Sequence, residues 1–559
     1  MGPALSKVDR EHPPQLAYGT AGFRCDATRL IIAMERVGML AALRSRDRQG
    51  LRIGVMVTAS HNPHKDNGVK IVDPSGAMLA QAWEAKAEQV ACCPESRLRE
   101  TLAAVAEGEA SHAVVVVGRD TRAHSRALSR RVLNGARALG ARVEDVGVVT
   151  TPQLHHCVRA ANGFQDLGAG PLYGYADRLV DAFAALLATA PFKTGRPDAT
   201  LVVDCAGGVG ALGLAAVKRR LDERNLGATL SLRAANIKAP LNEHCGAEHV
   251  QKQRLPPLNL ARTDVGAPNV RGCSLDGDAD RLVYWYHASN GFEIVDGDKI
   301  AALLAGFIAD ELKAAAPVLG PASLGVVQTA YANGSAAAFL GTKGIKVAFA
   351  KTGVKYVHHA AEAFDVGVYF ETNGHGTVLF TDTLRARLAQ LDSEPGMGGR
   401  ARLAVARLHA AARLANQAVG DAVADVLLVE AVLCLTSTSI VAWGALYAER
   451  PSRQLKQRVK SRALLQCNAT ETRLLEPAAL QAKLDALAAA AAGRAFVRPS
   501  GTEDVVRVYA EAPTRGAGIG RPLPTTAAGP ITALGSDVYT VEALLAHRQR
   551  GGKRQFLVR

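Results

Sequence analysis

Three aspartates, Asp276, Asp278 and Asp280, alternate with small residues in the segment DGDADR. In an extended loop this spacing directs three carboxylates to one side, where they repel one another unless a cation lies among them. An EF-hand begins with the same pattern, but its sixth and twelfth positions would here be Arg281 and His287 instead of Gly and Glu. The pattern predicts a Mg²⁺ site with coordination positions open to a phosphate oxygen. A polar turn with solvated acids is the alternative.

A second segment, RPSGTEDVVR, combines arginines, hydroxyl residues and a glycine. Arg498 and Arg507 can each bind a phosphate through two donors, and Ser500 and Thr502 add hydroxyl groups. Gly501 lets backbone N–H groups approach an anion closely. The lysine spacing of a nucleotide P-loop is missing. The segment predicts a phosphate-binding loop, with a simple Ser/Gly turn beside a strand as the alternative.

A third segment, VYFETNGHGTVLF, places polar residues between two apolar runs. Glu371, Asn373 and His375 can each donate to or accept from adjacent hydroxyl groups, and Gly374 allows a tight turn. This combination predicts a loop that binds a sugar. A plain hairpin with an Asn-Gly turn is nearly as good an interpretation.

Ser60 follows the apolar run IGVMV and therefore belongs to a loop at the end of a buried strand. The G-x-S-x-G motif of hydrolases is absent around it. We expect a relay between Ser60 and His61 to be geometrically poor, because neighbouring residues in a chain rarely face each other. A serine that itself carries phosphate would balance the charge of three aspartates and a divalent cation. We therefore predict that Ser60 is a phosphate carrier.

These candidate residues need elements that hold them, and the sequence predicts strands followed by helices. Buried strands are expected in LRIGVMVTAS, HAVVVVGRD, ATLVVDCAGG and ASLGVVQTAY, each of which ends in small or polar residues. Segments of helical period, such as SRALSRRVLNGARALG, separate them. AFVRPSGTEDVVRVYAEA predicts a strand, a loop and a strand. The alternation indicates the α/β class, with ligands at the strand-end loops.

Length and composition limit the function classes. A chain of 559 residues is too long for one hydrophobic core, and 48% apolar with 21% charged residues is typical of globular proteins. The 66 Lys and Arg exceed the 52 Asp and Glu, giving a net charge of +14. The excess is spread along the chain without a run of basic and aromatic residues, so nucleic acid is not favoured as a partner.

Cysteines and apolar runs bear on metal sites and location. The nine cysteines show no C-x-x-C spacing, which argues against a zinc site. Their odd number in a long chain argues for reduced thiols and a cytoplasmic location. There is no run of 18 apolar residues, so we expect no membrane span, and the polar N-terminal segment does not predict a signal peptide.

Taken together and in this order, the segments resemble the α-D-phosphohexomutase superfamily, and within it most closely the phosphoacetylglucosamine mutase family. The resemblance covers about residues 16–512. It rests on the segments YGTAGFR, TASHNPHKDNGVKIVDPSGAML, VVVGRDTRAHS, LNEHCGAEHVQK, DGDADR, AKTGVKYVHHAA, ETNGHGT and RPSGTEDVVRVYAEA.

The resemblance implies four domains around a central cleft, three of them mixed α/β and the last a smaller α+β domain. The implied ranges are 1–178 with the phosphoserine loop, 179–295 with the metal loop, 296–445 with the sugar loop and 446–512 with the phosphate loop. Residues 513–559 match nothing expected of the family, and we expect a poorly ordered tail there.

The implied reaction is the interconversion of N-acetylglucosamine 6-phosphate and 1-phosphate, on the route to UDP-N-acetylglucosamine. Phosphorylated Ser60 would give its phosphoryl group to the sugar, forming a 1,6-bisphosphate that reorients and returns the other phosphate. One Mg²⁺ would be held by Asp276, Asp278, Asp280 and the seryl phosphate. Arg24, His61, Lys70 and Arg281 would line the phosphoserine, with Lys70 or His61 as general acid/base.

The same resemblance assigns the other two loops. Glu371, Asn373, Gly374 and His375 would bind the sugar, and Arg498, Ser500, Gly501, Thr502 and Arg507 would bind the phosphate that does not react. A glucose or mannose phosphomutase and a non-catalytic sugar-phosphate binder are the alternatives. The implied partner is a small amino-sugar phosphate, with no nucleic acid, no membrane and no obligate protein partner.

Overall fold

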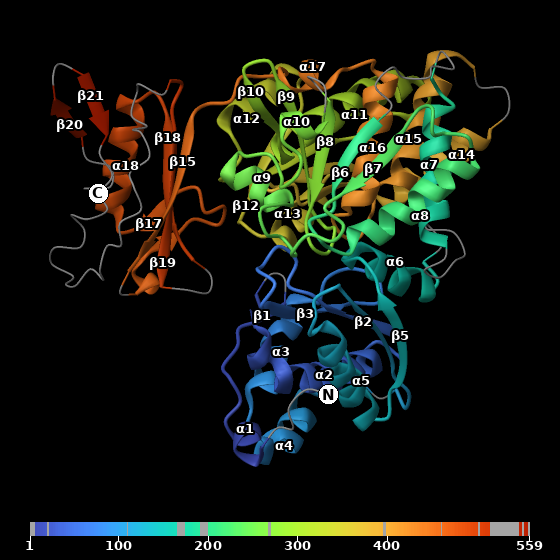
Figure 1. Cartoon of the computed structure of the whole chain (residues 1–559), viewed down its shortest axis with the longest axis vertical. Coiled ribbons are helices and arrows are strands. Elements are labelled where there is room, and N and C mark those ends of the chain that lie inside the picture. Colours follow the sequence, from blue (N-terminus) through green and yellow to red (C-terminus); the bar gives the residue numbers. More distant parts are fainter. Residues whose placement is uncertain are drawn as a thin grey trace. The chain divides into compact units, whose positions relative to one another are not determined.

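The computed structural model describes residues 6–19, 22–108, 110–164, 174–190, 200–265, 270–394, 398–459, 461–500, 504–514, 547–550 and 553–556. The chain forms two compact units. The first unit comprises residues 1–324 and 362–444, and the second comprises residues 325–361 and 445–559. Figure 1 labels many of the elements of both units. None of the described helices is both long enough and apolar enough to cross a lipid bilayer.

The first sheet of the first unit holds the serine loop. Its strands are ordered β1-β3-β2-β4-β5, with β2, β4 and β5 parallel and β1 and β3 antiparallel to their neighbours. The strands are β1 (Phe23–Asp26), β2 (Arg52–Val57), β3 (Asp66–Val72), β4 (Val114–Arg119) and β5 (Arg142–Val148). The helices of this region are α1 (Lys7–Glu11), η1 (Ala27–Leu30), α2 (Ile31–Asp47), α3 (Gln81–Cys92), α4 (Glu95–Val105), α5 (Ser125–Ala138) and α6 (Thr151–Ala161).

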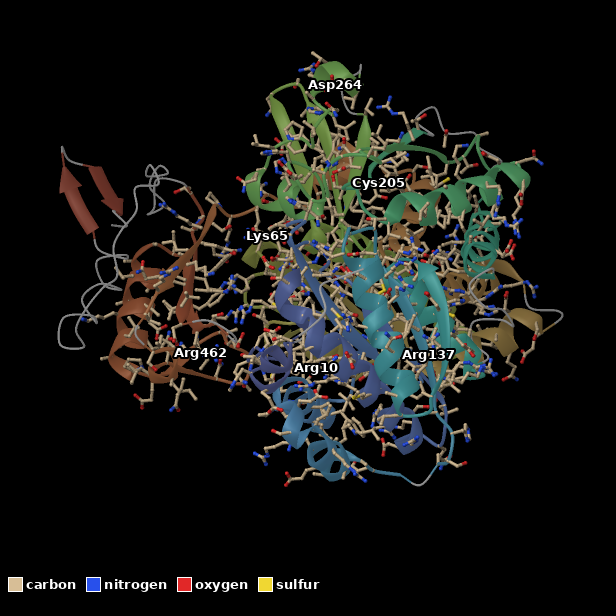
Figure 2. All side chains as sticks on the ribbon, turned by 60° about the horizontal axis from the view of Figure 1, so that its bottom comes forward. Arg10, Lys65, Arg137, Cys205, Asp264 and Arg462 are labelled. Atoms are coloured by element: carbon tan, nitrogen blue, oxygen red, sulfur yellow. The ribbon has the colours of Figure 1, made fainter. Side chains whose placement is uncertain are left out.

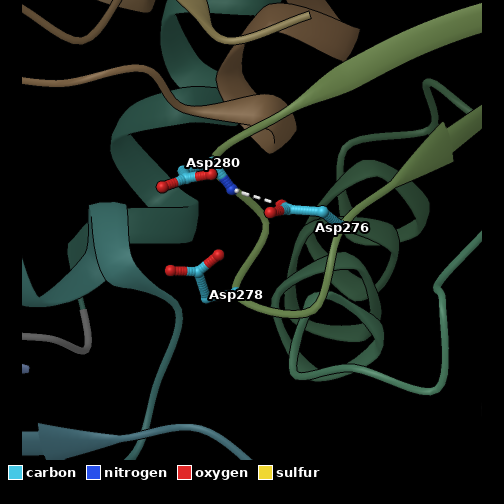
Figure 3. Close-up of side chains that lie close together, drawn as sticks. All are labelled: Asp276, Asp278 and Asp280. Carbon is cyan, nitrogen blue, oxygen red and sulfur yellow. Dashed lines mark hydrogen bonds between the residues drawn. The ribbon is translucent and has the colours of Figure 1, made fainter. Parts of the chain in front are cut away.

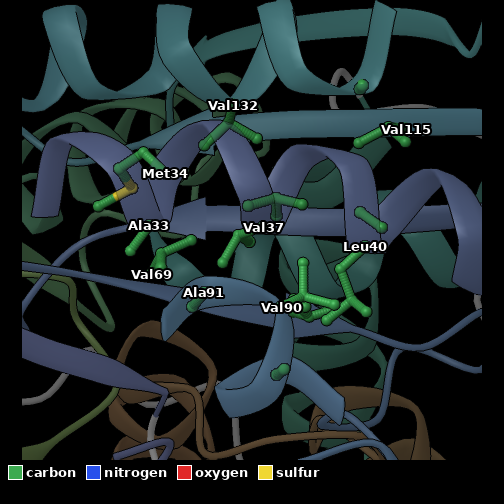
Figure 4. Packing of buried hydrophobic residues seen from close by; sticks show 14 of the residues in the cluster. Ala33, Met34, Val37, Leu40, Val69, Val90, Ala91, Val115 and Val132 are labelled. Carbon is green, nitrogen blue, oxygen red and sulfur yellow. The ribbon is translucent and has the colours of Figure 1, made fainter. Parts of the chain in front are cut away.

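Apolar residues bury both faces of this sheet. Val55 of β2 belongs to a large cluster that includes Val37 of α2 and Val132 of α5, part of which Figure 4 shows. Its neighbour Met56 points to the opposite face and belongs to a second cluster that includes Leu154 of α6. Because successive side chains of a strand alternate between faces, a strand covered on both sides must be apolar throughout. This is why the run IGVMV contains no polar residue.

A second sheet holds the aspartate loop. Its strands are ordered β10-β9-β8-β6-β7. They are β6 (Thr200–Asp204), β7 (Ser231–Ala235), β8 (Arg271–Leu275), β9 (Leu282–Ala288) and β10 (Gly291–Val295), and the helices along this stretch are α7 (Tyr175–Leu187), α8 (Gly210–Glu223), α9 (Ala247–Gln253) and α10 (Arg262–Val265). Strand β8 ends directly before Asp276 and β9 begins directly after Arg281. The two paired strands therefore fix both ends of the DGDADR loop.

The rest of the first unit is a hairpin with helices. Strands β13 (Val366–Phe370) and β14 (Gly376–Phe380) pair antiparallel. The helices are α11 (Gly297–Leu319), α14 (Asp382–Ser393), α15 (Gly399–Leu414), α16 (Ala422–Leu435) and α17 (Ile440–Gly444). Helix α16 is buried along its whole length up to Leu433 and packs against α7, α8, α11 and α15. It has no solvated face, which explains its almost uniformly apolar sequence.

The second unit contains the predicted phosphate loop. Strand β15 pairs with β19 and β19 with β18, all antiparallel. The elements are β11 (Leu324–Thr329), α12 (Gly334–Thr342), β12 (Lys346–Ala350), α13 (Val354–Ala361), β15 (Ser452–Arg458), η4 (Arg462–Leu464), β16 (Gln466–Cys467), β17 (Leu474–Glu476), α18 (Ala478–Ala490), β18 (Arg494–Pro499), β19 (Val505–Glu511), β20 (His547–Arg550) and β21 (Lys553–Phe556). The buried Glu511 carboxylate accepts the Gly334 N–H at 3.0 Å, which ties α12 to β19.

The structure confirms the predicted α/β class and the four predicted buried strands, which are β2, β4, β6 and β11. The helix in SRALSRRVLNGARALG and the strand-loop-strand pattern are also confirmed, as α5 and as β18 and β19. Helix α7 runs from Tyr175 to Leu187 across the position of the predicted boundary at 178/179. The predicted domain boundaries stay predictions. Of the predicted tail, residues 515–546, 551–552 and 557–559 lie outside the described residues.

Candidate active site

Ser60 is completely buried in the loop after β2, in an uncommon backbone conformation. Its φ is +51°, in the left-handed region that residues other than glycine rarely adopt. The Ser60 N–H donates to Thr58 Oγ1 at 3.0 Å. Its carbonyl accepts from Arg122 Nη2 at 3.0 Å and from Asn242 Nδ2 at 2.9 Å. Side chains from two other segments thus hold this conformation in place.

Arg122 holds the whole serine loop, a role that the sequence interpretation did not assign. Its guanidinium also donates to the carbonyls of Asn62, Pro63 and Asp66, at 2.6–2.9 Å. The buried Asp120 carboxylate accepts from Arg122 Nε at 3.0 Å and fixes the guanidinium. Both residues belong to the quoted segment VVVGRDTRAHS. The sequence did contain a signal for this role, since an acid and an arginine lie two residues apart directly after a buried strand.

The three aspartates form the predicted cluster. Asp276, Asp278 and Asp280 offer carboxylate oxygens within 4.8 Å of one another, and all three are buried. Figure 3 shows the tight loop, in which the Asp280 N–H donates to Asp276 Oδ1 at 3.1 Å. Ala279 at its tip has a φ of +59°. Burial contradicts the alternative of a polar turn with solvated acids.

The charge of this cluster fits a divalent cation. Burial and the neighbouring carboxylates of Asp280 and Asp278 raise the pKa of Asp276 well above its ordinary value. Asp278 Oδ1 is buried and has no hydrogen-bond partner among the described residues. Mg²⁺ prefers oxygen ligands such as carboxylates. A divalent cation would also offset the repulsion among the buried carboxylates. Ser60 Oγ donates to Asp276 Oδ2 at 2.6 Å, so the hydroxyl lies at the edge of the cluster.

Cationic side chains surround the same cluster. Lys70 Nζ lies 3.1 Å from Asp278 Oδ2 and 3.1 Å from Asp280 Oδ2. Burial lowers the pKa of Lys70, but these two carboxylates outweigh burial and the net shift is upward. Lys70 is therefore held as an ammonium ion, in contrast to the lowered pKa that a lysine base needs. Arg281 Nε lies 4.0 Å from Asp276 Oδ2 and 3.9 Å from Asp280 Oδ1.

Arg24 reaches the cluster from β1. Burial lowers its pKa, and Asp278, Asp280 and Asp276 are the anions that oppose this shift. Its Nε is buried without a hydrogen-bond partner among the described residues. A guanidinium with an unused donor next to a serine and an acidic cluster is suited to bind a phosphate.

His61 faces Ser60, although we expected a relay between these adjacent residues to be geometrically poor. Its Nδ1 lies 3.4 Å from Ser60 Oγ, and its Nε2 lies 3.2 Å from Glu248 Oε2. The left-handed φ of Ser60 provides the physical reason, because it turns the two side chains to the same side. Burial and the nearby charges of Arg281 and Arg24 lower the pKa of His61 well below its ordinary value. Of the two predicted acid/base candidates, His61 is thus the one held neutral.

The predicted sugar loop is a hairpin that packs against the aspartate loop. The Gly374 carbonyl accepts the Leu282 N–H at 3.0 Å, and Gly374 has a φ of +84°. Asn373 Oδ1 accepts the His375 N–H at 3.0 Å, so part of the Asn373 side chain stabilises the turn itself. His375 is buried, with Nδ1 3.4 Å from Asp280 Oδ1. The structure confirms the alternative interpretation of this segment, a hairpin with an Asn-Gly turn, and its role in sugar binding stays a prediction.

Glu371 and Glu248 are close enough to Arg281 to affect its ionisation. Burial lowers the pKa of Arg281, but the nearby acids outweigh burial and the net shift is upward. These acids are Asp276, Asp280, Glu248 and Glu371. Glu371 is therefore the member of the predicted sugar-binding set whose side chain acts electrostatically on Arg281.

Thr151 is a second residue that the sequence interpretation missed. Its Oγ1 donates to Asp278 Oδ2 at 2.6 Å and its backbone N–H donates to the Asp278 carbonyl at 3.1 Å. It is the first residue of α6 and follows β5, so it occupies another strand-end loop. This position was the signal that could have identified it.

The second unit holds Arg498, Ser500 and Arg507. Arg498 and Arg507 are paired directly across β18 and β19, which places two like charges side by side. Arg498 Nε donates to Tyr331 Oη at 3.0 Å, and its Nη1 lies 3.3 Å from Glu471 Oε2. Gly501 and Thr502 of this predicted loop lie outside the described residues. Two arginines paired across neighbouring strands are suited to bind a phosphate group.

Three family models match the chain. They are described as phosphoacetylglucosamine mutase AMG1, domain III (residues 296–438), phosphoglucomutase/phosphomannomutase alpha/beta/alpha domain I (residues 37–92 and 95–168) and the phosphoglucomutase/phosphomannomutase C-terminal domain (residues 464–518). The phosphoacetylglucosamine mutase of Sus scrofa is 45% identical over 504 residues, which cover 89% of this chain and 90% of the relative.

Solved structures of N-acetylglucosamine-phosphate mutases are also similar to this chain. An N-acetylglucosamine-phosphate mutase in its product complex matches with a TM-score of 0.83 and 36% identity, covering 92% of this chain and 98% of the other. The Aspergillus fumigatus enzyme with GlcNAc-6P and magnesium matches with a TM-score of 0.83 and 38% identity, covering 92% and 94%. A variant of that enzyme in complex with glucose 1,6-bisphosphate matches with a TM-score of 0.81 and 37% identity, covering 91% and 94%.

Proposed function

The chain belongs to the phosphoacetylglucosamine mutase family, and on that premise we propose that Ser60 carries the phosphoryl group in its reaction. The enzyme interconverts N-acetylglucosamine 6-phosphate and N-acetylglucosamine 1-phosphate. The observation that best supports the role of Ser60 is its place at the aspartate cluster, where Oγ lies 2.6 Å from Asp276 Oδ2.

In the first half of the cycle, the phosphoryl group of Ser60 passes to the free hydroxyl of the sugar phosphate. The bond between phosphorus and Ser60 Oγ breaks, the bond to the sugar oxygen forms, and the product is the sugar 1,6-bisphosphate. The bisphosphate reorients, and in the second half its other phosphoryl group returns to Ser60 Oγ. The two halves are chemically alike, so a single set of residues serves both.

Asp276, Asp278 and Asp280 would hold Mg²⁺ together with the seryl phosphate. Bound there, Mg²⁺ supplies positive charge that neutralises the phosphoryl oxygens in the transition state. Arg24, Lys70 and Arg281 would bind the same phosphoryl oxygens. The proximity of all three to the acidic cluster supports this assignment.

The remaining predicted residues would hold the rest of the substrate. Arg498, Ser500 and Arg507, with Gly501 and Thr502, would bind the phosphate that does not react. Glu371, Asn373 and Gly374 would bind sugar hydroxyls, and His375 would support them from its buried position beside Asp280. A sugar 1-phosphate made in this way serves the synthesis of UDP-N-acetylglucosamine.

We extend the proposal to the setting of the enzyme. All nine cysteines are described as thiols outside any disulfide, which supports the cytoplasm as its location. Figure 2 shows the side chains of the described residues, and the excess of basic residues is spread along the chain, which gives no support to a nucleic-acid or membrane partner. An obligate protein partner is not part of the proposal.

The test of the Ser60 proposal is a comparison of wild type with Ser60→Ala, assayed with Mg²⁺ and a trace of sugar 1,6-bisphosphate. We expect the variant to retain less than about one-thousandth of the wild-type kcat, as for other nucleophile deletions. Ser129→Ala is the control, since Ser129 is buried in α5 and donates only within that helix, to the Arg126 carbonyl at 3.1 Å. We also expect one phosphate on Ser60 in the purified wild type by peptide mass spectrometry.

Other outcomes would lead to different conclusions. Equal turnover by Ser60→Ala, or a phosphate found consistently on another residue, would contradict the proposal. A substrate panel with glucose, mannose and N-acetylglucosamine phosphates tests the sugar. Preference for glucose 1-phosphate would favour the phosphoglucomutase alternative, and no turnover of any of them would favour a non-catalytic binder.

A further inference from the structure

Glu471 is a buried carboxylate of the second unit to which the proposed function assigns no role. It lies in the loop between β16 and β17. Its Oε2 lies 3.3 Å from Arg498 Nη1 and accepts the Thr352 N–H at 3.2 Å, and its Oε1 lies 4.0 Å from Lys351 Nζ. One carboxylate therefore connects an arginine of the predicted phosphate loop with the segment between β12 and α13.

The backbone holds Glu471 in an uncommon conformation. Its φ is +56°, a left-handed value that residues other than glycine rarely adopt and that is often found at functional sites. The Glu471 N–H donates to the Asn468 carbonyl at 3.0 Å. The Asn468 side chain accepts the Thr472 N–H at 3.0 Å and donates to Thr472 Oγ1 at 3.0 Å. The loop is thus fixed by its own hydrogen bonds, independently of the contact between Glu471 and Arg498.

Two contacts fix the guanidinium group of Arg498. Its Nε donates to Tyr331 Oη at 3.0 Å, and its Nη1 faces Glu471. The Tyr331 ring is itself packed edge-on against Phe496, with 5.1 Å between the ring centroids. Because a guanidinium is planar, contacts on two different nitrogens restrict both its position and the rotation of its plane. Neither contact involves Nη2, so this nitrogen can donate to a phosphate oxygen.

Glu471 also places negative charge beside a pair of like charges. Arg498 and Arg507 lie directly opposite each other on β18 and β19, where their charges repel. A carboxylate next to Arg498 offsets part of this repulsion. The Thr352 N–H and Lys351 share the same carboxylate, so its charge is partly compensated and repels a phosphate less than a lone carboxylate would.

We propose that Glu471 is a positioning residue for substrate binding, which holds the Arg498 guanidinium in the orientation that binds the non-reacting phosphate. The inference rests on the proposed role of Arg498. Glu471 takes no part in bond making or breaking. The non-reacting phosphate stays bound in the ground state and in the transition state, so a misplaced guanidinium weakens both equally. Loss of Glu471 should therefore raise KM and leave kcat nearly unchanged.

The test compares Glu471→Ala with Glu471→Gln. The glutamine amide oxygen can replace Oε2 as the acceptor for Arg498 Nη1 and the Thr352 N–H, whereas alanine removes the acceptor. Glu471→Met fills a similar volume without an oxygen and repeats the measurement without a cavity. Asp485→Ala is the matched control, because it removes an acid of α18 in the same unit that pairs with the exposed Arg473 at 2.7 Å. KM and kcat for N-acetylglucosamine 6-phosphate and the melting temperature are measured for each.

We expect Glu471→Ala and Glu471→Met to raise KM by about 10–100-fold, the size of effect that loss of an outer partner has on ligand affinity in metal sites. Their kcat should change less than about threefold. Glu471→Gln should stay within about threefold of the wild type in both constants, and Asp485→Ala should match the wild type. A lower melting temperature with an unchanged KM in both acceptor-free variants would show a purely structural role and overturn the inference.

A double-mutant cycle with Arg498→Ala decides whether Glu471 acts through Arg498. If it does, Glu471→Ala should raise KM no further in the Arg498→Ala background. A second full rise there, or an equal rise in Glu471→Gln and Glu471→Ala, would overturn the inference. A wild-type KM in Arg498→Ala alone would instead overturn the proposed role of Arg498 in phosphate binding, and the inference with it.

Discussion

At the level of single residues, a few neighbouring side chains set the pKa values of the carboxyl groups in the acidic cluster. Burial raises the pKa of Asp276 well above its ordinary value, but Lys70, His375 and Arg281 outweigh burial at Asp280 and hold its pKa well below. Two carboxylates four residues apart thus ionise differently because their neighbours differ. Such a pair needs additional positive charge to be ionised together, and a divalent cation provides it.

Thr151→Val tests how far the outer partners of these carboxylates control metal binding. Thr151 Oγ1 donates to Asp278 Oδ2 at 2.6 Å, and valine keeps the shape of the side chain without the donor. We expect half-saturation by Mg²⁺ to need about 10–100-fold more metal, with KM for the sugar nearly unchanged. Mg²⁺ titration of the activity measures this.

The control is Thr101→Val, in which a buried threonine of α4 loses only a bond to the Arg97 carbonyl in its own helix. Equal Mg²⁺ dependence of Thr151→Val and Thr101→Val would show that the Thr151 hydroxyl does not orient Asp278.

At the level of secondary-structure elements, the N-terminus of a helix also stabilises one of the functional loops. The Ala422 N–H at the start of α16 donates to the Ala279 carbonyl in the aspartate loop at 3.1 Å. Asp421 caps this helix by accepting from the Ala424 N–H at 3.1 Å, and Tyr175 Oη donates to its carboxylate at 2.7 Å. An apolar helix buried on all sides thus supports a loop of three acids.

Asp425 is an exception within α16, and it yields a prediction about pH. Its carboxyl is completely buried, and neither oxygen has a hydrogen-bond partner among the described residues. Burial and the neighbouring Asp421 raise its pKa well above the ordinary value. At pH values between its unfolded-state and folded-state pKa, such a carboxyl is protonated in the folded protein and ionised in the unfolded protein. Stability is therefore lost as the pH rises from about 4, the unfolded value, towards the folded pKa.

Asp425→Asn cannot ionise, so the variant should gain stability relative to the wild type across this range. The difference should grow by at most about 1.4 kcal/mol per pH unit, the limit for one proton. Urea unfolding of both proteins between pH 5 and 8 measures it. Asp421→Asn serves as the contrast and should be destabilised, since its carboxylate is fully hydrogen-bonded. A pH-independent difference for Asp425→Asn would contradict the prediction.

At the scale of the whole molecule, the acidic cluster links ligand binding to stability. The serine loop, the aspartate loop and the sugar loop come from distant parts of the chain but belong to the same compact unit. A cation that binds only when these loops are assembled must stabilise that unit against unfolding.

We expect Mg²⁺ at 100 times its dissociation constant to stabilise this unit by about 2.7 kcal/mol. The melting temperature of the corresponding transition should rise, while Asp278→Asn should show little or no rise. Asp264→Asn, which changes an exposed acid of α10, should respond like the wild type. Chelation by EDTA should reverse both the stabilisation and the activity, as differential scanning fluorimetry and turnover assays can measure. An equal Mg²⁺ response in Asp278→Asn would place the cation elsewhere.

Local patterns in the chain were enough to predict the strands, the loops that follow them and the kinds of chemical group on those loops. The run IGVMV had to be a strand covered on both faces, and Asp276, Asp278 and Asp280 had to share one side of a short loop. Such features follow from local geometry, since a strand alternates every residue and a buried loop cannot leave three anions unbalanced. The resemblance of these segments to known sequences was the basis for predicting the family.

Which side chains contact one another could not be predicted, because it depends on how distant elements pack. Ser60 and Asp276 are 216 residues apart, and Thr151 and Asp278 are 127 apart, so no local spacing relates them. The contact between Ser60 and His61 also escaped prediction, because it depends on a left-handed φ that Arg122 and Asn242 hold from other segments. Packing of distant elements sets these contacts, and a linear pattern records only the residues available to make them.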